Sequence, residues 1–149
     1  MSEKEVLLTT GYSGHDLASF LGKLKEHDVS VVVDVRQNPV SRKKGFSASK
    51  LSAFLIDHGV DYVHVPELGV PVALREQLKA GEQDLGAYLD GFRDYLAGCG
   101  DALDRLYGLA IKKRCCLICV EHLHRECHRS VVAEAVQARN GHKLKVVHV

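Results

Sequence analysis

The sequence lacks the features that mark several specialised classes of protein. No stretch approaches the ~20 consecutive apolar residues that span a bilayer, and residues 1–5 are short and charged, without the apolar run of a signal peptide. No repeat and no low-complexity tract is present. We therefore expect a cytoplasmic protein with no membrane partner.

The chain also lacks an excess of charge of either sign, since 20 basic and 19 acidic side chains leave a net charge of +1. Composition alone thus indicates neither nucleic acid nor an anionic membrane as a partner, and any cationic patch must be local. Five cysteines are an odd number for a disulfide framework, and thiols of the cytoplasm stay reduced. Cysteines 99, 115, 116, 119 and 127 are expected to serve in core packing, metal binding or catalysis.

What remains is an ordinary globular composition, with 46% apolar and 26% charged residues over a length of 149. It predicts one domain, residues 1–149. Short β-branched runs alternate with longer segments of helical period, which is typical of parallel strands joined by helical crossovers. Strands are predicted at 6–10, 30–35, 61–65, 115–120 and 144–149. The predicted fold is a three-layer, Rossmann-like α/β fold, with an open, mainly parallel sheet of about five strands and helices on both faces.

Helical periodicity fills the intervals between these strands. Apolar spacing predicts amphipathic helices at 16–24 and 51–58 and a further helix after residue 129. Prolines and glycines between residues 68 and 113 predict two or three shorter helices there. The stripe that contains Tyr88 and Phe92 is interpreted as core packing rather than as a cofactor contact.

Polar residues directly follow four of the predicted strands. In open parallel sheets, ligands bind beyond the carboxyl ends of the strands. We expect polar groups from different strand ends to converge on one crevice, namely Asp34, Arg36, Glu67, Glu121 and Arg129.

The same segments carry a family resemblance. Over almost its whole length the chain resembles the domain of unknown function 488 family, in motifs whose order and spacing are specific. The motifs are Gly11-Tyr12-Ser13, Asp34-Val35-Arg36, Ser41-Arg42, Phe46-Ser47, residues 62–69, Cys119-x-Glu121 and Cys127-His128-Arg129. The chain departs from the family pattern at Tyr12, where histidine is common, and at Val70, where a second glycine often follows. The resemblance implies a Rossmann-like α/β domain and assigns no reaction.

The run Cys127-His128-Arg129 lies near the start of the last predicted helix. The amides and dipole of a helix N-terminus stabilise an anion, either a thiolate at Cys127 or a bound phosphate. Arg129 adds a planar fork suited to phosphate or carboxylate. In the structural alternative, Cys127 is a buried core residue and Arg129 pairs with Glu121 or Asp34.

Three further positions each have two possible roles, and a fourth favours a single role. Asp34 either takes part in the chemistry or forms a salt bridge or cap that fixes the following loop. Glu67 is either a general base or the partner of an arginine. Ser13 either binds phosphate through its hydroxyl or shapes a turn, whereas the loop around Arg42 favours anion binding.

We predict an enzyme of unassigned reaction that acts on an anionic substrate, phosphate-bearing or nucleotide-related, in a cationic pocket. Its partner is thus an anionic small molecule or nucleotide, and no cofactor is expected. The catalytic candidates are Cys127, Asp34, Glu67, Glu121 and His128. The substrate-binding candidates are Tyr12, Ser13, Arg36, Arg42 and Arg129.

Two other functions are kept as alternatives. In a non-catalytic nucleic-acid or nucleotide-binding module, basic residues at 36 and 42–44 would bind phosphates while Tyr12 or Phe46 stacks on a base. A zinc site is suggested by Cys119, His122, His124 and Cys127, four ligands within nine positions. Against zinc, the cysteines at 115, 116 and 119 lie in a strand whose side chains alternate between faces. We assign no metal ligand and expect folding without zinc.

Overall fold

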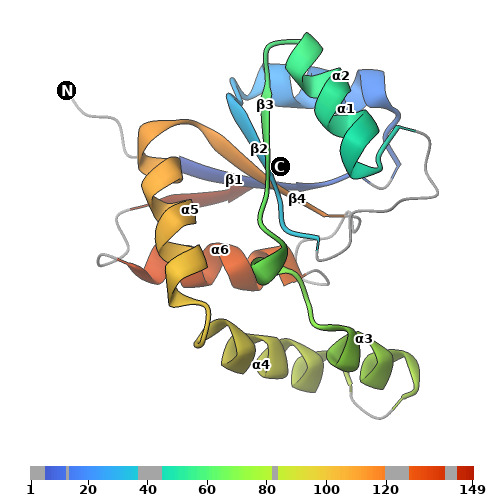
Figure 1. Ribbon diagram of the computed structural model, residues 1–149, viewed down its shortest axis with the longest axis vertical. Coiled ribbons are helices and arrows are strands. Elements are labelled where there is room, and N and C mark those ends of the chain that lie inside the picture. Colours follow the sequence, from blue (N-terminus) through green and yellow to red (C-terminus); the bar gives the residue numbers. More distant parts are fainter. Residues whose placement is uncertain (1–5, 13, 37–44, 82–83, 120–127, 140–143) are drawn as a thin grey trace.

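The computed structural model describes residues 6–12, 14–36, 45–81, 84–119, 128–139 and 144–149. Their five strands form one parallel sheet in the order β3-β2-β4-β1-β5 (Figure 1). The strands are β1 (Val6–Gly11), β2 (Val31–Asp34), β3 (Asp61–His64), β4 (Cys115–Cys119) and β5 (Lys145–His148). The predicted Rossmann-like α/β fold is confirmed, and each predicted strand agrees with the observed one to within one residue at each described end.

Six α-helices lie in the described part of the chain. They are α1 (Leu17–Glu26), α2 (Ala48–Asp57), α3 (Val72–Lys79), α4 (Leu85–Leu96), α5 (Gly100–Lys112) and α6 (His128–Ala138), and the 3-10 turn η1 (Pro66–Leu68) follows β3. The segment predicted to break into two or three helices holds α3, α4 and α5. Asp16 begins α1 as its N-cap, because its carboxylate accepts the Ser19 amide at 2.8 Å.

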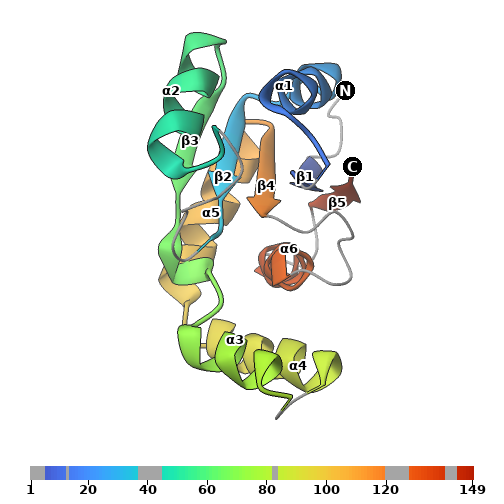
Figure 2. The ribbon, with the colours of Figure 1, turned by 90° about the vertical axis from the view of Figure 1, so that its right-hand side faces the viewer.

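The sheet separates two apolar cores, and alternate strand residues face each one. Leu7, Val33 and Leu117 pack against the helices of one face, α4 to α6. Leu8, Val32 and Ile118 pack against α1 and α2 on the other. Figure 2 shows α1 and α2 on the side of the sheet opposite to α6. No helix in the described ranges is both long and apolar enough to cross a membrane.

The strand order places a topological switch point at the carboxyl end of β4. The helices that follow β1 and β2, namely α1 and α2, lie on one face of the sheet, whereas those that follow β3 and β4, α3 to α6, lie on the other. Because β4 lies between β2 and β1, the helices that follow neighbouring strands diverge to opposite faces at this point. In open α/β sheets this divergence is where ligands bind.

Candidate functional site

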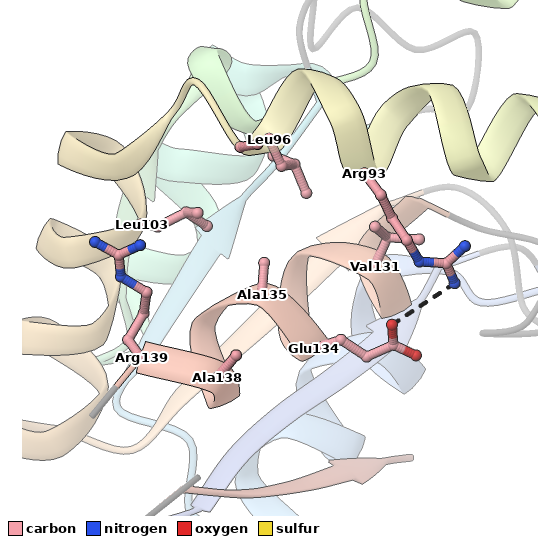
Figure 3. Close-up of a pocket in the computed structure, with 9 residues that line it drawn as sticks. Arg93, Leu96, Leu103, Val131, Glu134, Ala135, Ala138 and Arg139 are labelled. Carbon is pink, nitrogen blue, oxygen red and sulfur yellow. Dashed lines mark ion pairs between the residues drawn. The ribbon is translucent and has the colours of Figure 1, made fainter. Parts of the chain in front are cut away.

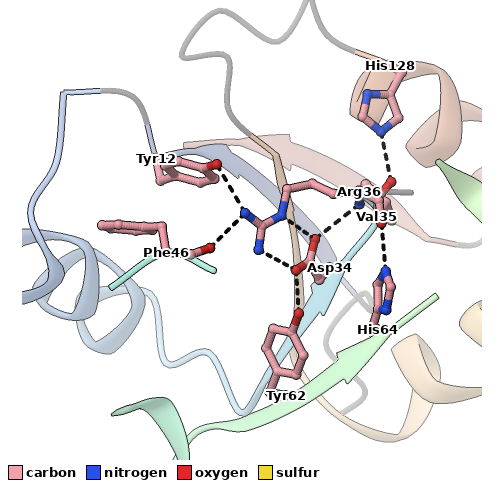
Figure 4. A network of polar contacts seen from close by, with 8 residues as sticks. All are labelled: Tyr12, Asp34, Val35, Arg36, Phe46, Tyr62, His64 and His128. Atoms are coloured by element: carbon pink, nitrogen blue, oxygen red, sulfur yellow. Dashed lines mark hydrogen bonds and ion pairs between the residues drawn. The ribbon is translucent and has the colours of Figure 1, made fainter. Parts of the chain in front are cut away.

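Asp34, the last residue of β2, is fully buried and its two carboxylate oxygens accept four hydrogen bonds. Oδ1 accepts the backbone N–H of Arg36 at 3.1 Å and its Nε–H at 2.8 Å. Oδ2 accepts Nη2 of Arg36 at 2.6 Å and a short hydrogen bond from the Tyr62 hydroxyl (Figure 4). Four bonds fill the accepting capacity of a carboxylate. Asp34 therefore has the geometry of a salt-bridged positioning residue, which is one of its two predicted roles.

Arg36 is 7% exposed, and four of its five side-chain N–H groups have acceptors. Nη1 donates to the Tyr12 hydroxyl at 3.1 Å and to the Phe46 carbonyl at 2.8 Å, in addition to the two bonds to Asp34. The second N–H of Nη2 has no acceptor within the described ranges. Burial alone would lower the pKa of Arg36, but the hydrogen bond and charge of Asp34 outweigh it and raise the pKa. Arg36 is a permanent, oriented cation.

Tyr62, on the neighbouring strand β3, is the fourth hydrogen-bond donor to the Asp34 carboxylate. Burial, followed by the hydrogen bond to Asp34, raises the pKa of the Tyr62 phenol well above its usual value. The phenol therefore stays protonated and donates. Tyr62 pairs with Val32 in the β2–β3 register, so its reach to Asp34 depends on these two strands being neighbours. Without the strand order, the sequence contains no signal for this contact.

Tyr12 and Phe46 are packed against each other beneath the guanidinium of Arg36. Their rings are stacked with centroids 4.5 Å apart, and both side chains are buried. The guanidinium lies 5.3 Å from the Tyr12 ring centroid, within cation–π range. The expectation that Tyr12 or Phe46 stacks on a nucleic-acid base is therefore wrong for this conformation, because neither ring has an open face. Tyr12 instead supports the guanidinium through its hydroxyl.

Two imidazoles flank the same stretch of backbone beyond β2 (Figure 4). His64 Nε2 lies 2.7 Å from the Arg36 carbonyl oxygen, and His128 Nε2 lies 3.0 Å from that of Val35. A carbonyl oxygen only accepts, so Nε2 carries the proton in both rings and, in a neutral ring, Nδ1 carries the lone pair. Burial lowers the pKa of His128 to about 4, and the charge of Arg129 acts in the same direction. His128 is therefore neutral at physiological pH.

Arg129 stands in the first turn of α6 and is 1% exposed. Its Nη1 lies 3.7 Å from the sulfur of Cys119, at the carboxyl end of β4. The structure thus brings Arg129 to the end of the central strand and, through His128, ties the start of α6 to the end of β2.

The cysteines of β4 differ in oxidation state. Cys115 and Cys116 are free and lie in opposite cores, as the predicted alternation requires, and burial raises the pKa of each thiol to about 12. Such thiols are inert core groups. Cys119 is disulfide-bonded, so the expectation that every thiol stays reduced is wrong at this position.

Glu67 lies on η1 and turns its carboxylate toward α5. Its Oε2 accepts Nη2 of Arg105 at 2.8 Å, and both side chains are largely exposed. Its own backbone N–H and the hydrogen bond from Arg105 lower the pKa of Glu67. The geometry matches the arginine partner, one of the two predicted roles, and the structure does not bring this carboxylate to Asp34 and Arg36.

The other candidates, Ser13, Arg42, Glu121 and Cys127, lie outside the described residues, as do Lys43, Lys44, His122 and His124 of the alternatives. Sequence reasoning assigned no role to Tyr62 and His64, which the structure places against Asp34 and Arg36. The described residues contain no group of three or more histidine, cysteine or acidic side chains able to hold a metal ion.

Comparison with known proteins gives a family and little else. A family model described as "Domain of unknown function DUF488" matches residues 16–136, most of the chain. The matched span includes Asp34, Arg36, His64 and Arg129. No curated protein and no solved structure matches the chain.

Proposed function

Because the chain belongs to the DUF488 family, a domain of unknown function, we propose its activity from the site alone. The protein is an enzyme that acts on an anionic substrate, phosphate-bearing or nucleotide-related, at the carboxyl ends of β1, β2 and β4. One observation carries the proposal: the buried guanidinium of Arg36 is held rigidly by Asp34 while one Nη2 N–H has no acceptor within the described residues.

Anion binding at this place follows from orientation more than from net charge. The ion pair of Asp34 and Arg36 is neutral overall, and a buried pair of this kind adds little stability compared with apolar residues. What the pair provides is a guanidinium fixed by Tyr12, the Phe46 carbonyl and Asp34, so that a remaining N–H needs no reorganisation to meet an oxyanion. Phosphate oxygens are suitable acceptors for such a donor.

The proposal assigns proton transfer to His64 rather than to Asp34. All accepting positions of the Asp34 carboxylate are occupied, so it orients Arg36 instead of taking a proton. His64 is half-buried at the end of β3, and the Arg36 carbonyl fixes its Nε2–H tautomer. Its Nδ1 has no partner among the described residues and is the basic nitrogen of a ring that Nε2 holds against the Arg36 carbonyl. A general base needs this availability.

Calorimetric titration with inorganic phosphate, AMP and ATP tests the binding step. The native protein is expected to bind at least one of these probes saturably. Arg36→Lys keeps the charge but loses the planar fork, so affinity should fall by about tenfold or more. Arg105→Lys changes an exposed arginine on α5 in the same way and should leave affinity unchanged. A native protein that binds none of the probes contradicts the proposal.

Phosphorus NMR of the same mixtures tests turnover. His64→Gln keeps an N–H that can donate to the Arg36 carbonyl but has no basic nitrogen, so binding should persist while turnover is lost. Probe binding without turnover in the native protein would exclude an enzyme acting on these compounds. If single-stranded oligonucleotides then bind with a steep salt dependence, the non-catalytic nucleic-acid module is the better description.

A further inference from the structure

A cavity lies where α4, α5 and α6 meet, on the face of the sheet opposite to α1 and α2. The cavity has a volume of about 370 Å³. Its apolar lining includes Leu96, Leu103, Val131, Ala135 and Ala138 (Figure 3). The two alanines of α6 carry only methyl groups where α4 and α5 diverge, and this leaves the space unfilled. Protein interiors normally close such space, because unfilled volume forfeits packing contacts.

Charged side chains stand at two ends of this apolar surface. At one end, Nη2 of Arg93 lies 3.6 Å from Oε2 of Glu134, linking α4 to α6 (Figure 3). At the other end, Nε of Arg139 donates to Oδ1 of Asp104 at 2.8 Å, and Nη2 lies 2.7 Å from the same oxygen in an ion pair. Asp104 thereby orients the guanidinium, while Nη1 of Arg139 has no acceptor in the described part of the chain.

The lining itself contains two arginines and one glutamate. Asp90 and Asp104 pair with these arginines from outside the lining, so the Nη1 of Arg139 that is free among the described residues, not a net charge, is what can meet an anion. Both arginines are partly exposed, at 47% for Arg93 and 37% for Arg139, so they remain accessible to a ligand. A guanidinium forms its strongest hydrogen bonds with planar anions such as carboxylates. An apolar surface with a few charged groups at its margin, in a volume of this size, has the composition of small-molecule sites in proteins.

We propose that this cavity binds a small amphiphile with an apolar body and one anionic head, of the class of medium-chain carboxylates. The body lies on Leu103, Ala135 and Ala138, and the head accepts hydrogen bonds from Arg139. The site is separate from the strand-end site and does not depend on the function proposed for it. Apolar burial supplies affinity, and the arginine selects the charge of the head.

Three probes with the same body and different heads test the proposal: octanoate, octanol and octylammonium. Binding is measured by calorimetry and located by the chemical shifts of backbone amides. Octanoate should bind saturably and about tenfold or more tighter than octylammonium, because only its head complements Arg139. The largest amide shifts should fall on α5 and α6 around the cavity.

Substitutions separate the contributions of body and head. Ala135→Leu fills the cavity and should weaken octanoate binding by about tenfold or more, whereas Ala53→Leu at an exposed position of α2 should have no effect. Arg139→Gln should abolish the preference for octanoate over octanol, whereas Arg105→Gln, which removes an exposed arginine outside the cavity, should preserve it. If Ala135→Leu does not fold, Ala138→Leu at an exposed position serves the same purpose.

Several results would overturn the proposal. They are the absence of saturable octanoate binding to the native protein, equal affinity for all three heads, and octanoate affinity that survives both cavity-filling variants. Each would mean that the space between α4, α5 and α6 is a packing defect or receives something other than an anionic amphiphile.

Discussion

His128 and Val35 are joined by a hydrogen bond from the imidazole Nε2 to the carbonyl oxygen, at 3.0 Å, across 93 residues of sequence. The bond fastens the first residue of α6 to the backbone beyond β2, beside the carboxylate and guanidinium of Asp34 and Arg36. It requires a proton on Nε2 but not a charge on the ring.

The pKa of His128 predicts a pH dependence of stability. In the folded protein burial lowers this pKa from 6.5 to about 4, so between these values the unfolded chain binds a proton that the folded protein does not. Stability therefore falls as the pH is lowered from about 6.5 toward 4, by up to ~3 kcal/mol from this residue. His128→Gln can still donate to Val35 and should lack this component.

The measurement is urea unfolding of the native protein and of His128→Gln at several pH values. The difference between their free energies of unfolding cancels other titrating groups. It should shift in favour of the variant by ~3 kcal/mol at most as the pH is lowered. A difference that does not change with pH contradicts the buried, neutral imidazole.

Tyr62→Phe should destabilise the protein through Asp34. The substitution removes the hydroxyl that donates to Oδ2, in a carboxylate with no exposure to water. Oδ2 keeps the bond from Nη2 of Arg36 but loses its second donor, and a hydrogen bond to a charged group contributes about 1.5–3 kcal/mol. Tyr95→Phe is the matched control, because its hydroxyl donates to the Glu67 carbonyl at the surface, where water can replace it. If urea unfolding gives equal losses in the free energy of unfolding for the two variants, the buried contact with Asp34 stabilises the protein no more than the surface contact does.

Cysteine labelling should distinguish the three free thiols of the described residues by their rates of reaction. Cys115 and Cys116 are buried, with pKa values raised to about 12, whereas Cys99 is only partly buried. Thiolate is the form that reacts, so iodoacetamide at neutral pH should modify Cys99 first and leave the other two unmodified until the protein unfolds. The order of modification is measured by quenching the labelling reaction at successive times and identifying the modified peptides by mass spectrometry. Early labelling of Cys115 or Cys116 would show that β4 opens in the native state.

Local pattern was sufficient to predict the elements of this fold. The runs around Val33 and Ile118 are apolar on both faces, which is typical of strands covered by helices on each side. The helical segments between them favoured crossover connections, which are the connections that parallel strands need. This pattern predicted that Asp34 and Arg36 follow the carboxyl end of a parallel strand, the end at which open α/β sheets bind ligands.

The partners of those residues depended on the tertiary structure. Arg36 meets Tyr12 and Phe46, 24 and 10 residues away, and Glu67 meets Arg105 at a separation of 38. Side chains so far apart in sequence become neighbours only through the order β3-β2-β4-β1-β5 and the placement of the helices. Sequence periodicity specifies which face of an element is buried, because burial is local to the element. It does not specify what lies opposite, because many strand orders bury the same faces equally well.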